Sequence, residues 1–155
     1  MLKKYNGNDS EVVIPNSVTS IGDKAFSECE SLKEITIPNS VTSIGVWAFY
    51  YCESLKEITI PNSVTSIGEY AFSDCKSLTS ITIPDSVSYI GGGAFMGCHR
   101  LRNVKLPKGV DYTYVGLEQK QLLQIPNPPK HKDRAPHVYK APNGKRSKLT
   151  KKQWA

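Results

Sequence analysis

Apolar and polar positions recur every 23 residues between residues 11 and 110. In one copy, Ile35 and Ile37 alternate with Glu34 and Thr36, which is the two-residue period of a strand with one buried face. Pro38 follows and ends the strand, because it has no N–H group to donate to a sheet ladder. A second short extended run, Val-Thr-Ser-Ile, comes next. Each copy is therefore predicted to hold two short strands.

The rest of each copy predicts a short helical turn. Ala48, Phe49 and Cys52 are apolar at offsets of one and four residues, which fits one or two helical turns on the wall opposite the strands. A unit repeated at constant length is typical of a solenoid, in which each copy stacks on the next. We use the word column for the residues at one position of successive copies. The apolar columns are expected to form the core.

The repeated segment IPNSVTSIGDKAFSECESLKEI and its copies resemble leucine-rich repeats, and most closely the BspA-like type, also called the Treponema type. The resemblance covers residues 11–110, about two-thirds of the chain. It implies a curved right-handed solenoid with short parallel strands on one wall. It also implies a role in protein–protein contact, usually on bacterial or protist surfaces.

Both ends of the repeated region lose the pattern, as terminal repeats do. Residues 1–10 are expected to cap the first copy. After residue 110 no Ala-Phe pair or cysteine follows in register, so residues 111–125 are predicted to fold back as a C-terminal cap, with a short helix as one option. The solenoid itself is assigned to residues 11–110 and a basic tail or linker to residues 126–155.

Charge differs between the two parts of the chain. Residues 1–106 hold 9 Lys and Arg against 11 Asp and Glu, whereas residues 107–155 hold 11 against 3. No stretch approaches the roughly 20 apolar residues that a membrane-spanning helix needs. The start, MLKKYNGNDSEVVIP, lacks the apolar region of a secretory signal, which by default predicts a cytoplasmic location. The family resemblance predicts the cell surface or secretion instead.

The polar positions of the first strand form one candidate binding surface. They alternate with buried isoleucines and should face solvent on one wall, which in leucine-rich repeats is the usual docking site. The residues are Glu34, Thr36, Glu57, Thr59, Ser80, Thr82, Asn103 and Lys105. The alternative is a solvated sheet face.

A second candidate surface is a convex aromatic cluster on the helical wall, where the repeats differ most. Trp and Tyr are favoured anchors in protein interfaces. Four of them fall in two adjacent copies, beside the buried Ala-Phe-Cys positions, and are expected to be at least partly exposed: Trp47, Tyr50, Tyr51 and Tyr70. The alternative is local packing over the convex wall.

The cysteine column allows three interpretations. Buried free thiols that act as small apolar side chains are the first. Disulfides between neighbouring copies are the second, because the column spacing overlaps the usual Cα separation of a disulfide. Zinc binding is disfavoured, because a straight column cannot form a tetrahedron. The residues are Cys29, Cys52, Cys75 and Cys98.

The tail is rich in Pro and Lys and too poor in apolar residues to form a core, which predicts an extended or disordered segment. Its basic cluster is Lys145, Arg146, Lys148, Lys151 and Lys152. Such a run can contact phosphates, acidic proteins or anionic lipid, so nucleic-acid or anionic-surface binding is the alternative function. Tyr139 and Trp154 are its only aromatic residues, which gives base stacking little support.

Catalytic and cofactor chemistry find no support in the pattern. His99 lies at a variable position of the repeat, which is Glu30, Glu53 and Lys76 in the earlier copies. We interpret it as a surface substitution. No phosphate-binding glycine loop and no metal-ligand spacing are present in the sequence. We therefore predict a non-catalytic protein–protein interaction module with an unknown protein partner, no cofactor and no metal.

Overall fold

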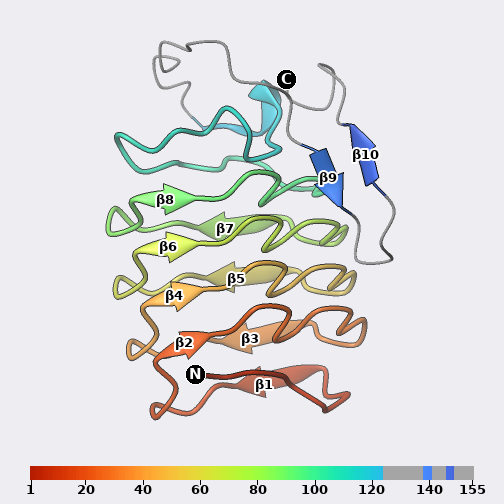
Figure 1. Ribbon diagram of the computed structural model, residues 1–155, viewed down its shortest axis with the longest axis vertical. Coiled ribbons are helices and arrows are strands. Elements are labelled where there is room, and N and C mark those ends of the chain that lie inside the picture. The colour runs from red at the N-terminus through yellow and green to blue at the C-terminus, as the bar shows by residue number, and fades with distance from the viewer. Residues whose placement is uncertain (124–137, 141–145, 149–155) are drawn as a thin grey trace.

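The molecule is a parallel solenoid, seen in a computed structural model that describes residues 1–123, 138–140 and 146–148. Two walls of short strands run along the stack (Figure 1). The first wall, here called the strand wall, carries β1 (Glu11–Val13), β3 (Glu34–Thr36), β5 (Glu57–Thr59) and β7 (Ser80–Thr82). The second carries β2 (Ser20–Ile21), β4 (Ser43–Ile44), β6 (Ser66–Ile67) and β8 (Tyr89–Ile90). The predicted repeat solenoid with parallel strands is confirmed.

Strands of successive copies pair in parallel and in register. Ile35 lies beside Val12, and Ile58 lies beside Ile81. On the second wall, β2, β4, β6 and β8 form one continuous sheet in chain order. Because the pairing offset equals the repeat length, each paired strand residue sits against its own counterpart in the neighbouring copy. The columns read from the sequence are therefore physical stacks.

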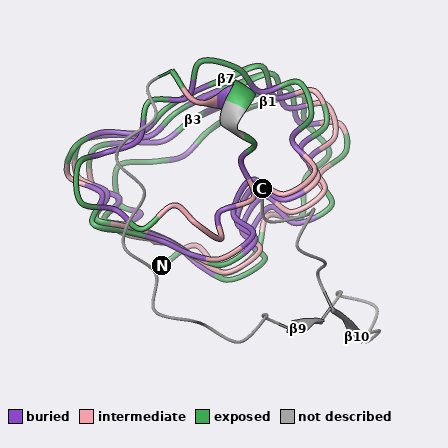
Figure 2. Ribbon diagram, turned by 90° about the horizontal axis from the view of Figure 1, so that it is seen from above, coloured by how far each residue is buried: buried purple, intermediate pink, exposed green. Residues whose placement is uncertain are grey.

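The core is the set of apolar columns enclosed by the coils. Figure 2, which looks down the stack, shows the buried residues lining the inside of the coils and the exposed residues outside. On the strand wall the isoleucine in the middle of β3, β5 and β7 is buried, while the residues on either side are exposed. This alternation is the predicted one, and it places the polar residues of the strand wall in solvent.

A stack of phenylalanine rings runs through the centre. Neighbouring ring centroids of Phe26, Phe49, Phe72 and Phe95 lie 5.2, 5.2 and 5.7 Å apart, with planes within 3° of parallel. Tyr5 continues the stack below Phe26 at 5.3 Å. Parallel rings at this separation are offset stacks, which aromatic pairs prefer. The N-terminal residues thus extend the stack with a different aromatic residue, outside the 23-residue period.

The wall opposite β1, β3, β5 and β7 is a series of linked turns, here called the turn wall. Within one copy, the N–H groups of Ala25 and Ser27 donate to the carbonyl oxygens three residues earlier, while those of Lys24, Phe26 and Glu28 donate to the next copy. Lys24 and Glu28 have positive φ angles of 58° and 62°. Left-handed residues interrupt a helix, so the predicted helical turns are single turns joined end to end.

The residues after the last full copy lie against its open end. Val115 and Leu117 are buried, and Leu122 forms a parallel bridge with Val104. That bridge joins residues 18 apart in the chain, so the 23-residue register has ended here. The 3-10 helix η1 (Gln119–Gln121) carries Gln121 directly before Leu122. The boundary of this cap at residue 125 lies outside the described residues.

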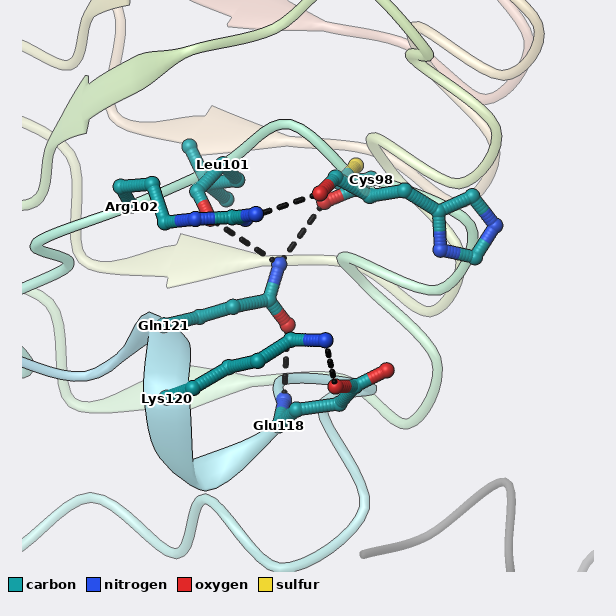
Figure 3. Close-up of polar contacts among 7 residues, drawn as sticks. Cys98, Leu101, Arg102, Glu118, Lys120 and Gln121 are labelled. Carbon is teal, nitrogen blue, oxygen red and sulfur yellow. Dashed lines mark hydrogen bonds and ion pairs between the residues drawn. The ribbon is translucent and has the colours of Figure 1, made fainter.

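Gln121 attaches the cap to the last full copy through its side chain. Its Nε2 donates to the carbonyl oxygens of Cys98 and Leu101 at 2.8 and 3.1 Å, and its Oε1 accepts from the N–H of Glu118 at 2.8 Å (Figure 3). The side chain is buried. The N–H of Leu101 also donates to the Cys98 carbonyl oxygen, and Arg102 Nη1 donates to that of Leu101, so the carboxamide adds a second donor to each.

Candidate functional site

A groove of about 820 Å³ lies along the strand wall. Its buried lining comes from four isoleucines in or directly after β3 and β5, and from two prolines: Ile35, Ile37, Ile58, Ile60, Pro61 and Pro84. Its polar lining includes five of the eight residues predicted for this surface: Glu34, Thr36, Glu57, Thr59 and Thr82. The other three, Ser80, Asn103 and Lys105, are exposed but do not line the groove.

The groove also contains residues that the strand pattern did not single out. Asn39, Lys56 and Asn62 line it beside the predicted residues. Asn39 and Asn62 follow the proline that ends each strand, so the Pro-Asn pair that recurs in the first three copies was a signal for them. Carboxylate, hydroxyl, amide and ammonium groups thus share one open surface. Such a surface is suited to hydrogen bonding and ion pairing with a polypeptide.

The strand wall is split where the groove lies. The ladder hydrogen bonds join β1 to β3 and β5 to β7, and among residues 1–123 no ladder joins β3 to β5. A single bond from the N–H of Lys56 to the carbonyl oxygen of Lys33, at 3.3 Å, lies at the edge of this break. The copies remain joined through the continuous second wall and the turn wall.

Negative side chains stack along the first part of the strand wall. Glu11 lies in register with Glu34, and Glu57 takes the same position in the next copy. All three are exposed, and none forms an ion pair with another residue of the described region. Like charges in neighbouring strand positions repel each other. Lys33 and Lys56 lie next to them along the chain, so the wall presents both signs of charge.

The aromatic cluster on the turn wall is mostly engaged within the chain. Lys24 Nζ lies 4.7 Å from the centre of the Trp47 ring, and Trp47 and Tyr70 centroids are 6.3 Å apart. Tyr70 in turn covers Gly93, where a Cβ atom would lie 2.1 Å from the tyrosine ring. These four residues form one column. The expectation of exposure is wrong for Tyr70, which is 7% exposed because its ring fills the space left by the glycine.

The other two aromatic residues also have local partners. Tyr50 and Tyr51 rings are 5.5 Å apart. Lys76 Nζ lies 4.6 Å from the centre of the Tyr51 ring, donates to its hydroxyl oxygen at 3.3 Å and forms an ion pair with Glu53. The hydrogen bond to Glu53 raises the pKa of Lys76. Trp47, Tyr50 and Tyr51 are half-buried, so the cluster offers less free aromatic surface than expected.

The cysteine column consists of free thiols. Three are buried, and each donates to the carbonyl oxygen of a phenylalanine in the preceding copy, as Cys52 does to Phe26 at 3.1 Å. Burial raises the pKa of Cys52 to about 12 and raises that of Cys75. Cys29 is only half-buried because the N-terminal residues cover it incompletely; burial still raises its pKa.

Part of the basic tail is described. Arg146 and Lys148 lie in β10 (Arg146–Lys148), which pairs in antiparallel fashion with β9 (Val138–Lys140). Lys145, Lys151 and Lys152 lie outside the described residues. Within the described part of the chain, no group of three or more His, Cys, Asp or Glu residues could hold a metal ion. Nor does any helix there have the length and apolar character to cross a membrane.

Stacked 23-residue coils with paired parallel strands and a polar strand wall define a leucine-rich repeat solenoid. Residues 4–116 match the BspA type leucine-rich repeat region in six copies. The chain belongs to the BspA-type leucine-rich repeat family. A search of curated proteins gives no match.

Several solved structures share this fold. A leucine-rich repeat protein of T. pallidum is 35% identical over 70% of this chain, with a TM-score of 0.67. One from Bacteroides ovatus is 36% identical over 72%, also with a TM-score of 0.67. A leucine-rich cell surface protein of Faecalibacterium prausnitzii is 36% identical over 70%, with a TM-score of 0.66. The matches cover 53%, 29% and 29% of those chains, so this chain spans about half of the first and under a third of the others.

Proposed function

We propose that this chain is a non-catalytic protein-interaction module and that the groove of the strand wall is its docking surface. Members of the leucine-rich repeat family are generally protein-interaction modules, which supports the coarse assignment. The more specific assignment, that the strand wall is the docking surface, is supported by the groove itself. It is open, combines exposed polar residues with buried apolar ones, and lies where the strand wall is split.

The strand wall is a better candidate than the convex aromatic cluster. Glu34 and Glu57 are exposed and form no ion pair with a described residue, so a partner can use them without breaking an existing contact. In the cluster, Trp47 stacks with Lys24 and Tyr70, and Tyr51 is held by Lys76. A partner would have to displace these contacts. Binding through the cluster and binding of nucleic acid or anionic surfaces through the tail remain predictions.

The test is a quantitative pull-down from a nuclease-treated extract of the source cells. Glu34→Lys with Glu57→Lys reverses two charges in the groove and should remove the bound protein. Glu28→Lys with Glu30→Lys makes the same change in charge at two exposed positions of the turn wall and should leave it bound. Equal binding by both variants contradicts the proposal. A parallel pull-down from untreated extract compares the full chain with residues 1–125. A partner found only there, and only with the full chain, would place the function in the basic segment.

We also infer that the module works at the cell surface. The support is its family, together with the F. prausnitzii relative that is described as a cell surface protein. Surface biotinylation of intact source cells should label the protein. Labelling only after lysis would support the cytoplasmic alternative.

A further inference from the structure

A second cavity, of about 300 Å³, lies where β8 meets the residues that follow the last full copy. Its buried lining is apolar and comes from Ile90, Val110 and Val115. Its more exposed lining comprises Ser88, Gly92 and Gly109 together with two tyrosines and two carboxylates: Tyr89, Tyr114, Glu69 and Asp111. A cavity of this size is at the lower end of those that hold small molecules, roughly 300–1,000 Å³.

The cavity lies where the chain departs from its own repeat. Tyr89 takes a position that is serine in the three earlier copies. Gly92 takes the position of Asp23, Val46 and Glu69 in those copies. Both changes fall in the fourth copy alone, and both residues line the cavity. The fourth copy has thus gained an aromatic side chain at position 89 and has no side chain at position 92, where the earlier copies have one.

The backbone does not require the glycine at position 92. Gly93, next to it, has a positive φ of 67°, but Gly92 is not among the residues with positive φ. A Cβ atom built on Gly92 meets only Tyr114, at 3.8 and 4.0 Å, which are ordinary contact distances. Neither conformation nor crowding accounts for the missing side chain. Its consequence is an open space beside Glu69.

We propose that this cavity binds a small organic ammonium ion. The rings of Tyr89 and Tyr114 can attract a cation through their electron-rich faces. The carboxylates of Glu69 and Asp111 supply negative charge, and the buried apolar residues suit methyl or methylene groups on nitrogen. Glu69 forms no ion pair with another residue in the described region. An anionic ligand would meet two carboxylates of its own sign. This site is separate from the groove of the strand wall.

The experiment is a titration of the ¹⁵N-labelled full chain with tetramethylammonium chloride, followed by amide chemical shifts at constant ionic strength. Saturable shifts confined to residues 89–92 and 110–115 are expected, with a dissociation constant in the millimolar range. tert-Butanol, which is similar in shape but neutral, should give no saturable shifts there. Equal shifts with tert-butanol, or shifts spread over all exposed carboxylates, would overturn the proposal.

Two variants restore the repeat at the site. Gly92→Val introduces the residue that Val46 provides in the second copy, fills the cavity and should weaken binding at least about tenfold. Its melting temperature should match that of the wild type, which separates loss of the site from loss of the fold. Tyr89→Ser, the residue of the other copies, should weaken binding about threefold through the lost ring contact. Unchanged affinity in a folded Gly92→Val variant would refute the site.

Discussion

Gln121 gives the sharpest test of how the solenoid ends. The change is Gln121→Ala, which removes the carboxamide from the end of the stack and leaves the backbone of η1 in place. In the wild type this side chain is buried, donates to two carbonyl oxygens and accepts one N–H. After the change, the carbonyl groups of Cys98 and Leu101 lose a donor at the last interface between copies.

The expected loss of stability follows from these three hydrogen bonds. Each contributes a net amount of about 0.5–1.5 kcal/mol. The carbonyl oxygens of Cys98 and Leu101 keep other donors, the N–H of Leu101 and Nη1 of Arg102, so neither is left unpaired. The contributions overlap because the end of the chain can relax toward water, so we expect a total of about 2–4 kcal/mol. For a chain of this size, that lowers the melting temperature by about 10 °C.

The assay is urea unfolding followed by circular dichroism, together with hydrogen exchange at Val104 and Leu123. The N–H of Val104 donates to the Gln121 carbonyl oxygen at 2.8 Å, and that of Leu123 to the Val104 carbonyl oxygen at 2.9 Å. Both amides should exchange faster in Gln121→Ala. Lys120→Ala is the matched control, because Lys120 is exposed and forms only an ion pair with Glu118, worth about 0–1 kcal/mol.

A carboxylate at position 121 tests whether the N–H groups of the Gln121 carboxamide are the source of the stabilisation. Gln121→Glu keeps the size but, when ionised, offers no donor to the two carbonyl oxygens. It should therefore be at least as destabilising as alanine at neutral pH. Burial against carbonyl oxygens raises the folded-state pKa of such a carboxyl group above its unfolded value. The variant should then recover stability as the pH falls toward about 4, where the protonated group can donate. Wild-type stability of both Gln121 variants would refute this account of the end.

Three further predictions concern the interior and the turns. Phe49→Ala interrupts the ring stack and should cost about 3–5 kcal/mol, so an unchanged thermal melt would contradict the column description. Cys29 should be the first thiol alkylated in the native protein, because Cys52, Cys75 and Cys98 are buried; four thiols reacting at one rate would contradict this. Glu28→Gly should stabilise the chain by up to about 1 kcal/mol by relieving a positive φ, whereas Glu28→Ala should give no such gain in urea melts.

Much of the fold could be predicted because a solenoid translates sequence period directly into space. Ile35 and Ile37 are buried and Glu34 and Thr36 exposed, as the two-residue alternation requires. The interior stack of phenylalanines follows from one residue type at one position of each copy. Tyr5 could not be predicted in this way, because it extends the same stack from a position outside the 23-residue period.

The candidate sites could be predicted only in part from the sequence. The strand-wall residues follow from alternation alone, but their exposure does not predict a groove. The aromatic cluster was expected at the surface, yet Tyr70 is buried because a glycine one copy later makes room for its ring. Side-chain burial on the turn wall depends on the neighbour in the column, which the residue's own surroundings in the sequence do not reveal. The cavity beside Gly92 depends on such a neighbour in the same way.

By itself, the sequence determined the solenoid, its repeat length, its core columns and the two faces of its strands. The tertiary structure alone decided where the strand wall is split. Residues 31–45 and 54–68 have the same sequence, yet β3 pairs with β1 and β5 pairs with β7. Local preferences are equal in two identical segments, so they cannot distinguish these partners. The difference arises from hydrogen bonds between coils, which are set by how the whole stack is packed.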